Sequence, residues 1–445
     1  MASDRPASFY DSPAEAAEAP PEKLLYVTCL HRGTGVERPD FVAVVDADPG
    51  SGSYGEIVHE TPMPRVGDEL HHFGWNRCSS ACHGPDRSHL IVPGFRSSRI
   101  YVLDVAENPR RPRIEHVVEA EELAEKTGYT RPHTVHCMPG DDVVVSMLGD
   151  RDGAGAGGFA VLDARSFEVK GRWENGGPNP RLGYDFWYQP RKNVLISSEF
   201  GAPNAYEEGF DPADVQAGRY GQRIHLWDLA ERRLTQTIDL GQNGLVPLEI
   251  RWLHDPDADE GFVAAALSSV IWRFQRSNGA YRADPVITTE PVEVEGFPFP
   301  APALITDQLI SMDDRFLYLS CWLHGELRQY DISDPARPRL TGQLQLGGLL
   351  GRPSDGDREL DGGPQMLQLS LDGRRLYVSN SLYSTWDNQF YPGLRSWLMR
   401  VNCLPDGGME IDPDFFVDLH DRPSGPARAH EVRLEGGDCT TEIFQ

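Results

Sequence analysis

The chain has 445 residues, and 42 Lys and Arg against 68 Asp and Glu give it a formal net charge of −26. A hydrophobic fraction of 39% and a charged fraction of 25% are ordinary for a globular protein. The acidic balance argues against a nucleic-acid partner, because phosphate backbones bind Lys and Arg. No apolar run is long enough to span a bilayer, so we expect no membrane partner either.

Residues 1–23 are polar and contain neither a basic start nor an apolar stretch, so they do not read as a signal peptide. We expect a polar N-terminal tail over 1–23 and a single domain over 24–445. Seven cysteines, an odd number in a chain of this length, do not indicate a disulfide framework. A cytoplasmic location fits best, with the periplasm as the alternative if a leader has been removed. No feature indicates the oligomeric state.

The chain contains a repeated hairpin in which a β-rich run ends near Asp, a turn follows, and a second β-rich run completes the unit. Two copies match plainly, YVLDVAENPRRPRIEHVVE and RQYDISDPARPRLTGQLQL, at 101–119 and 328–346. The weaker copies lie at 41–60, 159–174, 224–240, 270–287 and 397–419. Repeats of such units indicate a solenoid, propeller or array.

A second kind of hairpin alternates with the first. It begins with a polar or His residue, passes through a turn, and ends in an apolar triplet followed by a small residue. Its copies lie at 71–94, 133–146, 184–197, 248–267, 306–320, 365–379 and 430–444. Two hairpins make four strands, so the series predicts an all-β protein, a seven-bladed β-propeller. The alternative is two or three separate β domains, but no suitable linker interrupts the series.

The order of the hairpins predicts how the ring closes. The first unit, 41–60, is an outer hairpin, and the last, 430–444, is an inner one. Neither forms a blade alone, so we expect N- and C-terminal strands to share a blade. The Gly-, Pro- and Asp-rich stretches 200–223, 348–363 and 381–396 are expected to be loops on one face.

The innermost strand of each blade lines the central channel, and the repeat alignment selects one residue per blade near its axis. These residues are His72, His133, Tyr184 or Asp185, Glu249, Asp307, Gln365 and His430. Three of them are histidines, and they come from neighbouring blades. Imidazoles crowded in this way indicate a metal site, and an all-imidazole set suits copper or zinc better than calcium or magnesium.

Two ambiguities accompany this metal site. His71 and His72 should face opposite ways if they lie in a strand, so either one is a candidate ligand. Each histidine taken alone is more commonly a satisfied core or surface residue than a ligand. Glu249, Asp307 and Asp185 are candidate catalytic bases or groups that orient the metal ligands, and the alternative is that they are solvated carboxylates at the channel rim.

Cys78 lies six residues beyond His72, in the stretch Cys78-Ser-Ser-Ala-Cys82-His83. A Cys-x3-Cys spacing without a second pair is a weak metal signal. A thiol beside a metal-bearing channel is a candidate for binding sulfur or selenium compounds or for a catalytic role. The alternative is an inert thiol in a loop.

Several long strings resemble the selenium-binding protein family, and the similarity runs from about residue 24 to the end. The strings are PMPRVGDELHHFGWNRCSSACHG (62–84), LGYDFWYQPRKNVLIS (182–197), PLEIRWLHDPDA (247–258), LSCWLHGELRQYDISDPARPRLTGQL (319–344), GGPQMLQLSLDGRRLYVSNSLYSTWDNQFYP (362–392) and GPARAHEVRLEGGDC (425–439). The resemblance implies a methanethiol oxidase, which converts a small thiol, O₂ and water into formaldehyde, hydrogen peroxide and hydrogen sulfide, with copper as the cofactor. It also implies selenium at Cys78, although the family motif carries no counterpart of the inserted Ala81.

We therefore expect copper, with zinc as the less favoured ion, on His133, His430 and His71 or His72. Glu249, Asp307 and Cys78 are the candidate catalytic residues. The rival hypothesis is a non-catalytic scaffold that holds selenium or a thiol at Cys78, and such a scaffold would not need the axial histidines. A lactonase-like metal hydrolase is a third possibility, but it would require oxygen ligands around calcium.

Overall fold

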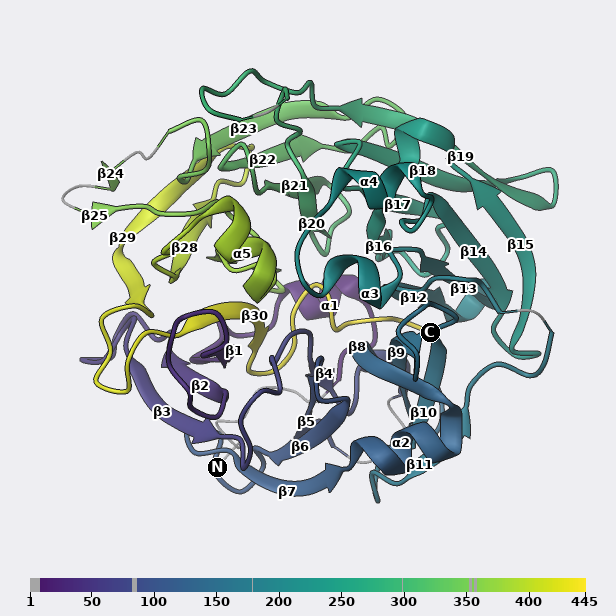
Figure 1. Cartoon of the computed structure of the whole chain (residues 1–445), viewed down its shortest axis with the longest axis horizontal. Coiled ribbons are helices and arrows are strands. Elements are labelled where there is room, and N and C mark those ends of the chain that lie inside the picture. The colour runs from purple at the N-terminus through teal and green to yellow at the C-terminus, as the bar shows by residue number, and fades with distance from the viewer. Residues whose placement is uncertain (1–8, 82–85, 178, 298, 352–353, 356–357) are drawn as a thin grey trace.

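The computed structural model describes residues 9–445 except 82–85, 178, 298, 352–353 and 356–357. Seven four-stranded antiparallel sheets are arranged around a central axis, which confirms the predicted β-propeller (Figure 1). No helix in the described ranges is long and apolar enough to cross a bilayer.

Six blades are built from consecutive strands, and each is written here from its innermost strand outward. They are β4 (Gly74–Trp75), β5 (His89–Gly94), β6 (Arg99–Asp104) and β7 (Arg113–Val118); β8 (Tyr129–Met138), β9 (Asp142–Asp150), β10 (Gly158–Asp163) and β11 (Val169–Arg172); β12 (Phe186–Gln189), β13 (Val194–Ser198), β14 (Arg223–Asp228) and β15 (Arg233–Asp239); β16 (Pro247–Trp252), β17 (Glu260–Ala265), β18 (Val270–Ser277) and β19 (Ala280–Thr288); β20 (Ile305–Ile310), β21 (Phe316–Cys321), β22 (Glu326–Asp331) and β23 (Arg339–Gln345); β26 (Leu367–Leu369), β27 (Arg375–Ser379), β28 (Trp397–Cys403) and β29 (Met409–Asp418).

The seventh blade joins the two ends of the chain, as predicted, but the number of strands that each end contributes differs from the prediction. Its order is β3 (Ile57–Pro62), β2 (Phe41–Asp46), β1 (Leu24–Leu30) and β30 (Arg428–Leu434). Three strands are N-terminal, and the C-terminal segment supplies one strand, not the expected hairpin over 430–444. The second strand is β1, an apolar run with every residue buried, which pairs with β30 in the register Leu25↔Leu434.

Burial of the strands explains why the ring holds together. The two inner strands of most blades are buried on both faces, as in β1 and β16, whereas outer strands such as β15 alternate half-buried and exposed residues. The sequence of a strand packed between two neighbouring blades is a continuous apolar run, whereas the sequence of an edge strand alternates between apolar and polar residues.

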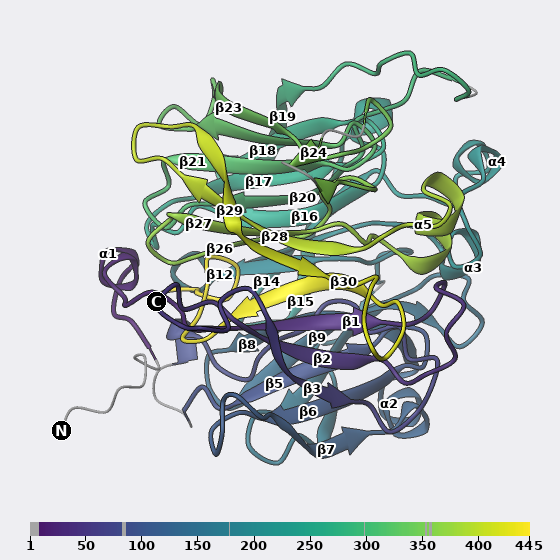
Figure 2. The same ribbon diagram turned by 90° about the vertical axis from the view of Figure 1, so that its left-hand side faces the viewer.

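Short helices lie on both faces of the ring. They are α1 (Pro13–Ala17), α2 (Ala120–Thr127), α3 (Pro203–Tyr206), α4 (Pro212–Gln216) and α5 (Ser384–Phe390). Figure 2 shows α3, α4 and α5 on one face, and α1 with the C-terminal end on the other. Two of the three predicted loops therefore meet on one face, where Trp386 Nε1 of α5 donates to Tyr206 O of α3 at 3.0 Å. The third stretch contains β24 (Ser354–Asp355) and β25 (Arg358–Glu359).

The N-terminal segment is more than a polar tail in its described part, residues 9–23. Tyr10 is buried, and its hydroxyl donates to Gly436 O at 3.1 Å. Ser12 caps α1 by accepting from Glu15 N. Glu22 accepts two hydrogen bonds from the Arg375 guanidinium at 2.7 and 2.8 Å. The buried Tyr10 ring, which contributes about 2 kcal/mol, and the Glu22–Arg375 pair together hold this segment against the propeller.

Candidate metal centre and chamber

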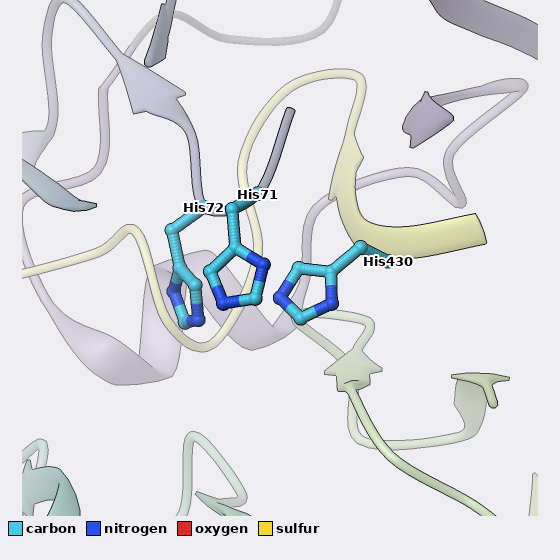
Figure 3. A group of neighbouring side chains, drawn as sticks. All are labelled: His71, His72 and His430. Carbon is cyan, nitrogen blue, oxygen red and sulfur yellow. The ribbon is translucent and has the colours of Figure 1, made fainter. Parts of the chain in front are cut away.

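Four histidines meet on the channel axis. The imidazoles of His71 and His430 stack with centroids 3.6 Å apart, and those of His72 and His133 lie 4.0 Å apart. One nitrogen from each of His71, His72 and His430 falls within 4.8 Å of the others. Figure 3 shows the His71 ring between those of His72 and His430. The repeat alignment thus selected residues that the structure brings together.

Both neighbours in the His71–His72 pair face this cluster, so the expectation that only one of them does is wrong. The expectation assumed an extended strand in which side chains alternate. The inner strand of this blade is only β4, Gly74–Trp75, and residues 71–73 precede it in irregular backbone. The alternation rule therefore does not apply to them.

Three of these imidazoles keep one nitrogen free. The Nε2 atoms of His72, His133 and His430 are buried and lack a hydrogen-bond partner among the described residues. Nδ1 of His430 donates to Ser381 O at 2.8 Å, and Nδ1 of His133 lies 3.0 Å from Thr134 Oγ1. A hydrogen bond at Nδ1 orients an imidazole and leaves its Nε2 lone pair for a metal.

Burial also keeps these side chains uncharged. It lowers the pKa of His430 to about 3, and it lowers the pKa of His71, His72 and His133 well below the usual value. The neighbouring imidazoles lower the pKa of His71, His72 and His133 further. Neutral imidazole is the form that binds transition metals. The donor set, its free nitrogens and its charge state therefore fit copper or zinc.

Carboxylates lie beside the cluster, as the alignment suggested, but they differ in what they can do. Glu249 Oε2 accepts from Arg251 Nη2 at 2.9 Å, whereas its Oε1 has no hydrogen-bond partner among the described residues and lies 3.8 Å from His72 Nε2. Both oxygens of Asp307 accept backbone hydrogen bonds, from Gln308 N and Leu367 N. Glu249 thus has an oxygen available to a ligand, whereas both oxygens of Asp307 are occupied by backbone hydrogen bonds.

Arg251 is a buried cation that sequence reasoning missed. Its guanidinium reaches Asp185, Glu249 and Asp307 at 3.1, 2.9 and 3.4 Å. Burial raises the pKa of Asp307 to about 7 despite this neighbour, and burial together with Asp185 raises the pKa of Glu249 well above its usual value. Arg251 lies two residues after Glu249 in β16, and this spacing places both on one face of a strand. That spacing was the available signal.

A largely apolar chamber of about 40 Å³ lies beside the histidines, between the ring and the covering loops. His71 and His133 form part of its wall. The remaining lining residues are Phe95, Leu148, Tyr184, Phe200, Tyr206, Phe210, Val246, Leu248, Ala266, Leu267, Leu304, Thr306, Leu382, Tyr383 and Trp386. These residues come from many separate loops and strands, so no local sequence motif identifies them. A concave apolar space beside a few polar groups is typical of a small-molecule site.

Cys78 does not line this chamber. It is bonded to Cys137 of β8 in a disulfide, with Cα atoms 6.1 Å apart, beside a separate cavity of only about 10 Å³. The expectation that the cysteines form no disulfide is therefore wrong for this pair. Cys137 lies four residues after His133, in a strand packed against the loop that carries Cys78. Cys82 lies outside the described residues.

The disulfide closes a loop of 59 residues between two blades. In the chain-entropy model such a link contributes roughly 4 kcal/mol to the free energy of unfolding. We expect a reductant to lower the melting temperature of the wild type by several degrees. The Cys78→Ser/Cys137→Ser variant should melt lower and show no response to the reductant. Equal reductant sensitivity of both proteins would show that this pair does not form in solution.

Comparison with known proteins supplies the family. The family model described as "56kDa selenium binding protein (SBP56)" matches residues 3–445. This chain belongs to the selenium-binding protein family. Among curated relatives in this family, a "Methanethiol oxidase" of Xenopus laevis is 51% identical, and that of Homo sapiens is 50% identical. Each alignment covers 98% of both chains.

A solved structure of the same family has the same fold. A hypothetical selenium-binding protein from Sulfolobus tokodaii superposes with a TM-score of 0.95 at 48% identity. The superposition covers 98% of this chain and 99% of that one. A periplasmic gluconolactonase of Pseudomonas aeruginosa, at 15% identity and a TM-score of 0.60, shares the propeller fold alone.

Proposed function

We propose that this protein is a copper-dependent methanethiol oxidase that reacts methanethiol with O₂ and water to give formaldehyde, hydrogen peroxide and hydrogen sulfide. Relatives about 50% identical over nearly the full chain carry the name methanethiol oxidase. The observation that carries the proposal is the cluster of buried, neutral imidazoles beside an apolar chamber, in which the Nε2 atoms of His72, His133 and His430 have no hydrogen-bond partner among the described residues.

His72, His133 and His430 would hold the metal through Nε2, with His71 as a fourth candidate ligand. Bound copper would supply a soft Lewis acid for sulfur and one-electron chemistry between thiol and oxygen. Copper is preferred over zinc because the reaction moves electrons and zinc has no redox chemistry.

The chain's own groups account for the rest of the reaction. The apolar chamber takes the methyl group of the thiol and limits access of bulk water. Glu249 Oε1 accepts a proton from the methyl carbon as the carbon–sulfur double bond forms, because it is the carboxylate oxygen beside His72 that has no hydrogen-bond partner in the described part of the chain. Water then hydrolyses the thioaldehyde to formaldehyde and hydrogen sulfide. The two electrons and two protons released reduce O₂ to hydrogen peroxide.

Glu249→Gln tests this role for the carboxylate. We expect kcat for methanethiol to fall about 10²–10⁴-fold, the usual contribution of a positioned base, while copper content stays at the wild-type level. The measurement is oxygen uptake with a parallel metal analysis. Asp307→Asn is the matched control. It should lower the melting temperature, because Asp307 accepts backbone hydrogen bonds, and it should lower kcat far less than Glu249→Gln does. A Glu249→Gln variant with near-wild-type kcat would remove Glu249 from the mechanism.

A non-catalytic scaffold holding selenium at Cys78 is the competing function. That sulfur is already bonded to Cys137, so selenium at Cys78 does not fit the described state. The Cys78→Ser variant separates the two functions. A copper enzyme centred on the histidines keeps measurable methanethiol turnover without this sulfur, and a scaffold shows no turnover in either form.

A further inference from the structure

The segment that carries His71 and His72 is not held by strand pairing. Residues 71–73 have no regular secondary structure, and the strand that follows them, β4, has only two residues. His430 reaches the same cluster from a different part of the chain, the fully buried strand β30 (Figure 3). The hydrogen-bonded ladder of a blade therefore does not set the position of the first two imidazoles relative to the third.

Side chains of β30 hold this segment instead. Phe73, the residue after His72, donates its backbone N–H to Glu431 Oε2. The carbonyl of Phe73 accepts from Arg433 Nε at 2.9 Å, and Arg433 Nη2 donates to Glu431 Oε1 at 2.7 Å. Both side chains from β30 are more than nine-tenths buried, so water does not compete for these bonds.

Strand β1 adds a second connection between the same two parts of the chain. Thr28 Oγ1 donates to His71 O at 2.9 Å and accepts from Glu431 N at 3.1 Å. A single hydroxyl thus links the backbone of His71 to the backbone of Glu431. The residue next to His430 is therefore tied to both sides of the His71–His72 pair.

The carboxylate of Glu431 also lies beside one of the imidazoles. Its Oε1 is 3.5 Å from His72 Nδ1, and His72 Nε2 has no hydrogen-bond partner in the described part of the chain. A carboxylate beside Nδ1 favours the tautomer that carries its proton there, which leaves the Nε2 lone pair for a metal.

The same kind of bond joins other neighbouring blades. Asp185 accepts from Ile250 N at 2.7 Å. Asp307 accepts from Leu367 N at 2.8 Å. In each case a buried carboxylate beside the channel binds the inner strand of the next blade. Glu431 is the counterpart between the shared blade and the blade of β4, and there the bonded segment carries two of the histidines.

We propose that Glu431 is a positioning residue for the metal centre, and that it fixes the His71–His72 segment relative to His430. The inference rests on the proposed function for the presence of a metal, but not for the oxidation of methanethiol. A ligand set held in advance binds a metal more tightly than one that must be ordered on binding.

Glu431→Gln tests this role. An amide of the same shape offers one accepting oxygen in place of two, so it cannot accept from both Phe73 N and Arg433. We expect the Cu²⁺ affinity of the metal-free protein, measured by competition with a chelator, to fall about 10–100-fold. The electron paramagnetic resonance spectrum of the bound Cu²⁺ should also change, because it reports the geometry of the ligands.

Asp307→Asn is the matched control, because it alters a carboxylate that makes the same kind of bond to a segment without clustered histidines. Both variants should melt below the wild type, since each leaves a buried donor without its acceptor. Asp307→Asn should keep the wild-type Cu²⁺ affinity and spectrum. Wild-type affinity and spectrum in Glu431→Gln, or an equal loss of affinity in both variants, overturns the positioning role.

Thr28→Val supplies a second variant in case Glu431→Gln does not fold. It keeps the shape of the side chain and removes the hydroxyl that links His71 O to Glu431 N. The loss of these hydrogen bonds should weaken Cu²⁺ binding about 2–10-fold. If Glu431→Gln is insoluble, wild-type Cu²⁺ affinity in Thr28→Val overturns the proposal.

The metal-binding measurement separates this inference from the proposed function. Weaker Cu²⁺ binding by Glu431→Gln than by Asp307→Asn supports the positioning role even if the wild type does not oxidise methanethiol. Methanethiol oxidation by the wild type, together with unchanged Cu²⁺ affinity in Glu431→Gln, overturns the positioning role and leaves the proposed function standing. A wild type that binds no copper overturns both.

Discussion

The His133→Ala/His430→Ala variant should lose the copper that the wild type retains when both are purified from copper-supplemented cells. Each replacement removes a neutral imidazole whose buried Nε2 has no hydrogen-bond partner within the described ranges. Loss of a residue that only orients a ligand already costs about 10–100-fold in metal affinity, so removal of two ligands should cost more than about 100-fold. Methanethiol turnover should fall to background with the metal. The measurement is copper per chain by elemental analysis.

His136→Ala is the matched control, because His136 lies in the same strand, β8. Its ring packs against Phe186 and Trp187, with centroids 5.2 and 4.8 Å away, and not against the histidine cluster. This variant should lose stability by leaving a cavity between blades, yet keep its copper. Full copper occupancy in the double variant would place the metal elsewhere in the protein.

Truncation after Pro426 should prevent formation of a soluble, monomeric protein. It removes β30, the inner strand of the shared blade, together with the buried side chains of Ala429, Val432 and Leu434. Each larger apolar side chain contributes about 1.5–3 kcal/mol, and the whole fold is stable by only about 5–15 kcal/mol. The loss also exposes the edge of β1, a strand buried along its whole length, which invites aggregation.

The truncated chain also loses His430. The His430→Ala variant is therefore needed to distinguish the effect of losing the strand on folding from the effect of losing the histidine on copper binding. That variant keeps β30 and its pairing with β1. It should remain monomeric in size-exclusion chromatography and lose copper. A truncated chain that stays monomeric with unchanged thermal unfolding would show that closure by β30 does not stabilise the ring.

The fold was accessible from the sequence because a propeller repeats the same local pattern. Alternating hairpins predicted the number of blades and the sharing of one blade by both termini. The composition of that blade was less accessible. The run Leu24–Leu30 carries no turn or partner signal in the sequence, and only its register against Leu434 shows that it is the second strand.

The site was predictable where the repeat itself carries the residues. His133, His430 and Glu249 occupy matched positions on inner strands, and the structure brings them to one axis. His71 was ambiguous because strand alternation was assumed where the backbone is irregular. The repeat alignment also grouped Asp307 with Glu249, although the hydrogen bonds of the two carboxylates differ.

Other features depend on contacts between segments distant in sequence. Cys78 and Cys137 are 59 residues apart, and their spacing matches no motif. Tyr206 and Tyr383 come from loops of different blades and meet only because α3 and α5 pack together above the channel. Sequence patterns report local structure and repeats, and they do not report which loops touch.

The most direct test of the proposed function is the stoichiometry of methanethiol oxidation by the copper-loaded wild type. One O₂ should be taken up for each methanethiol consumed, with one formaldehyde, one hydrogen peroxide and one hydrogen sulfide formed. Protein depleted of copper should show none of these products and should recover them when copper is restored. If fully copper-loaded protein leaves methanethiol unchanged in the presence of oxygen, this chain is not a methanethiol oxidase.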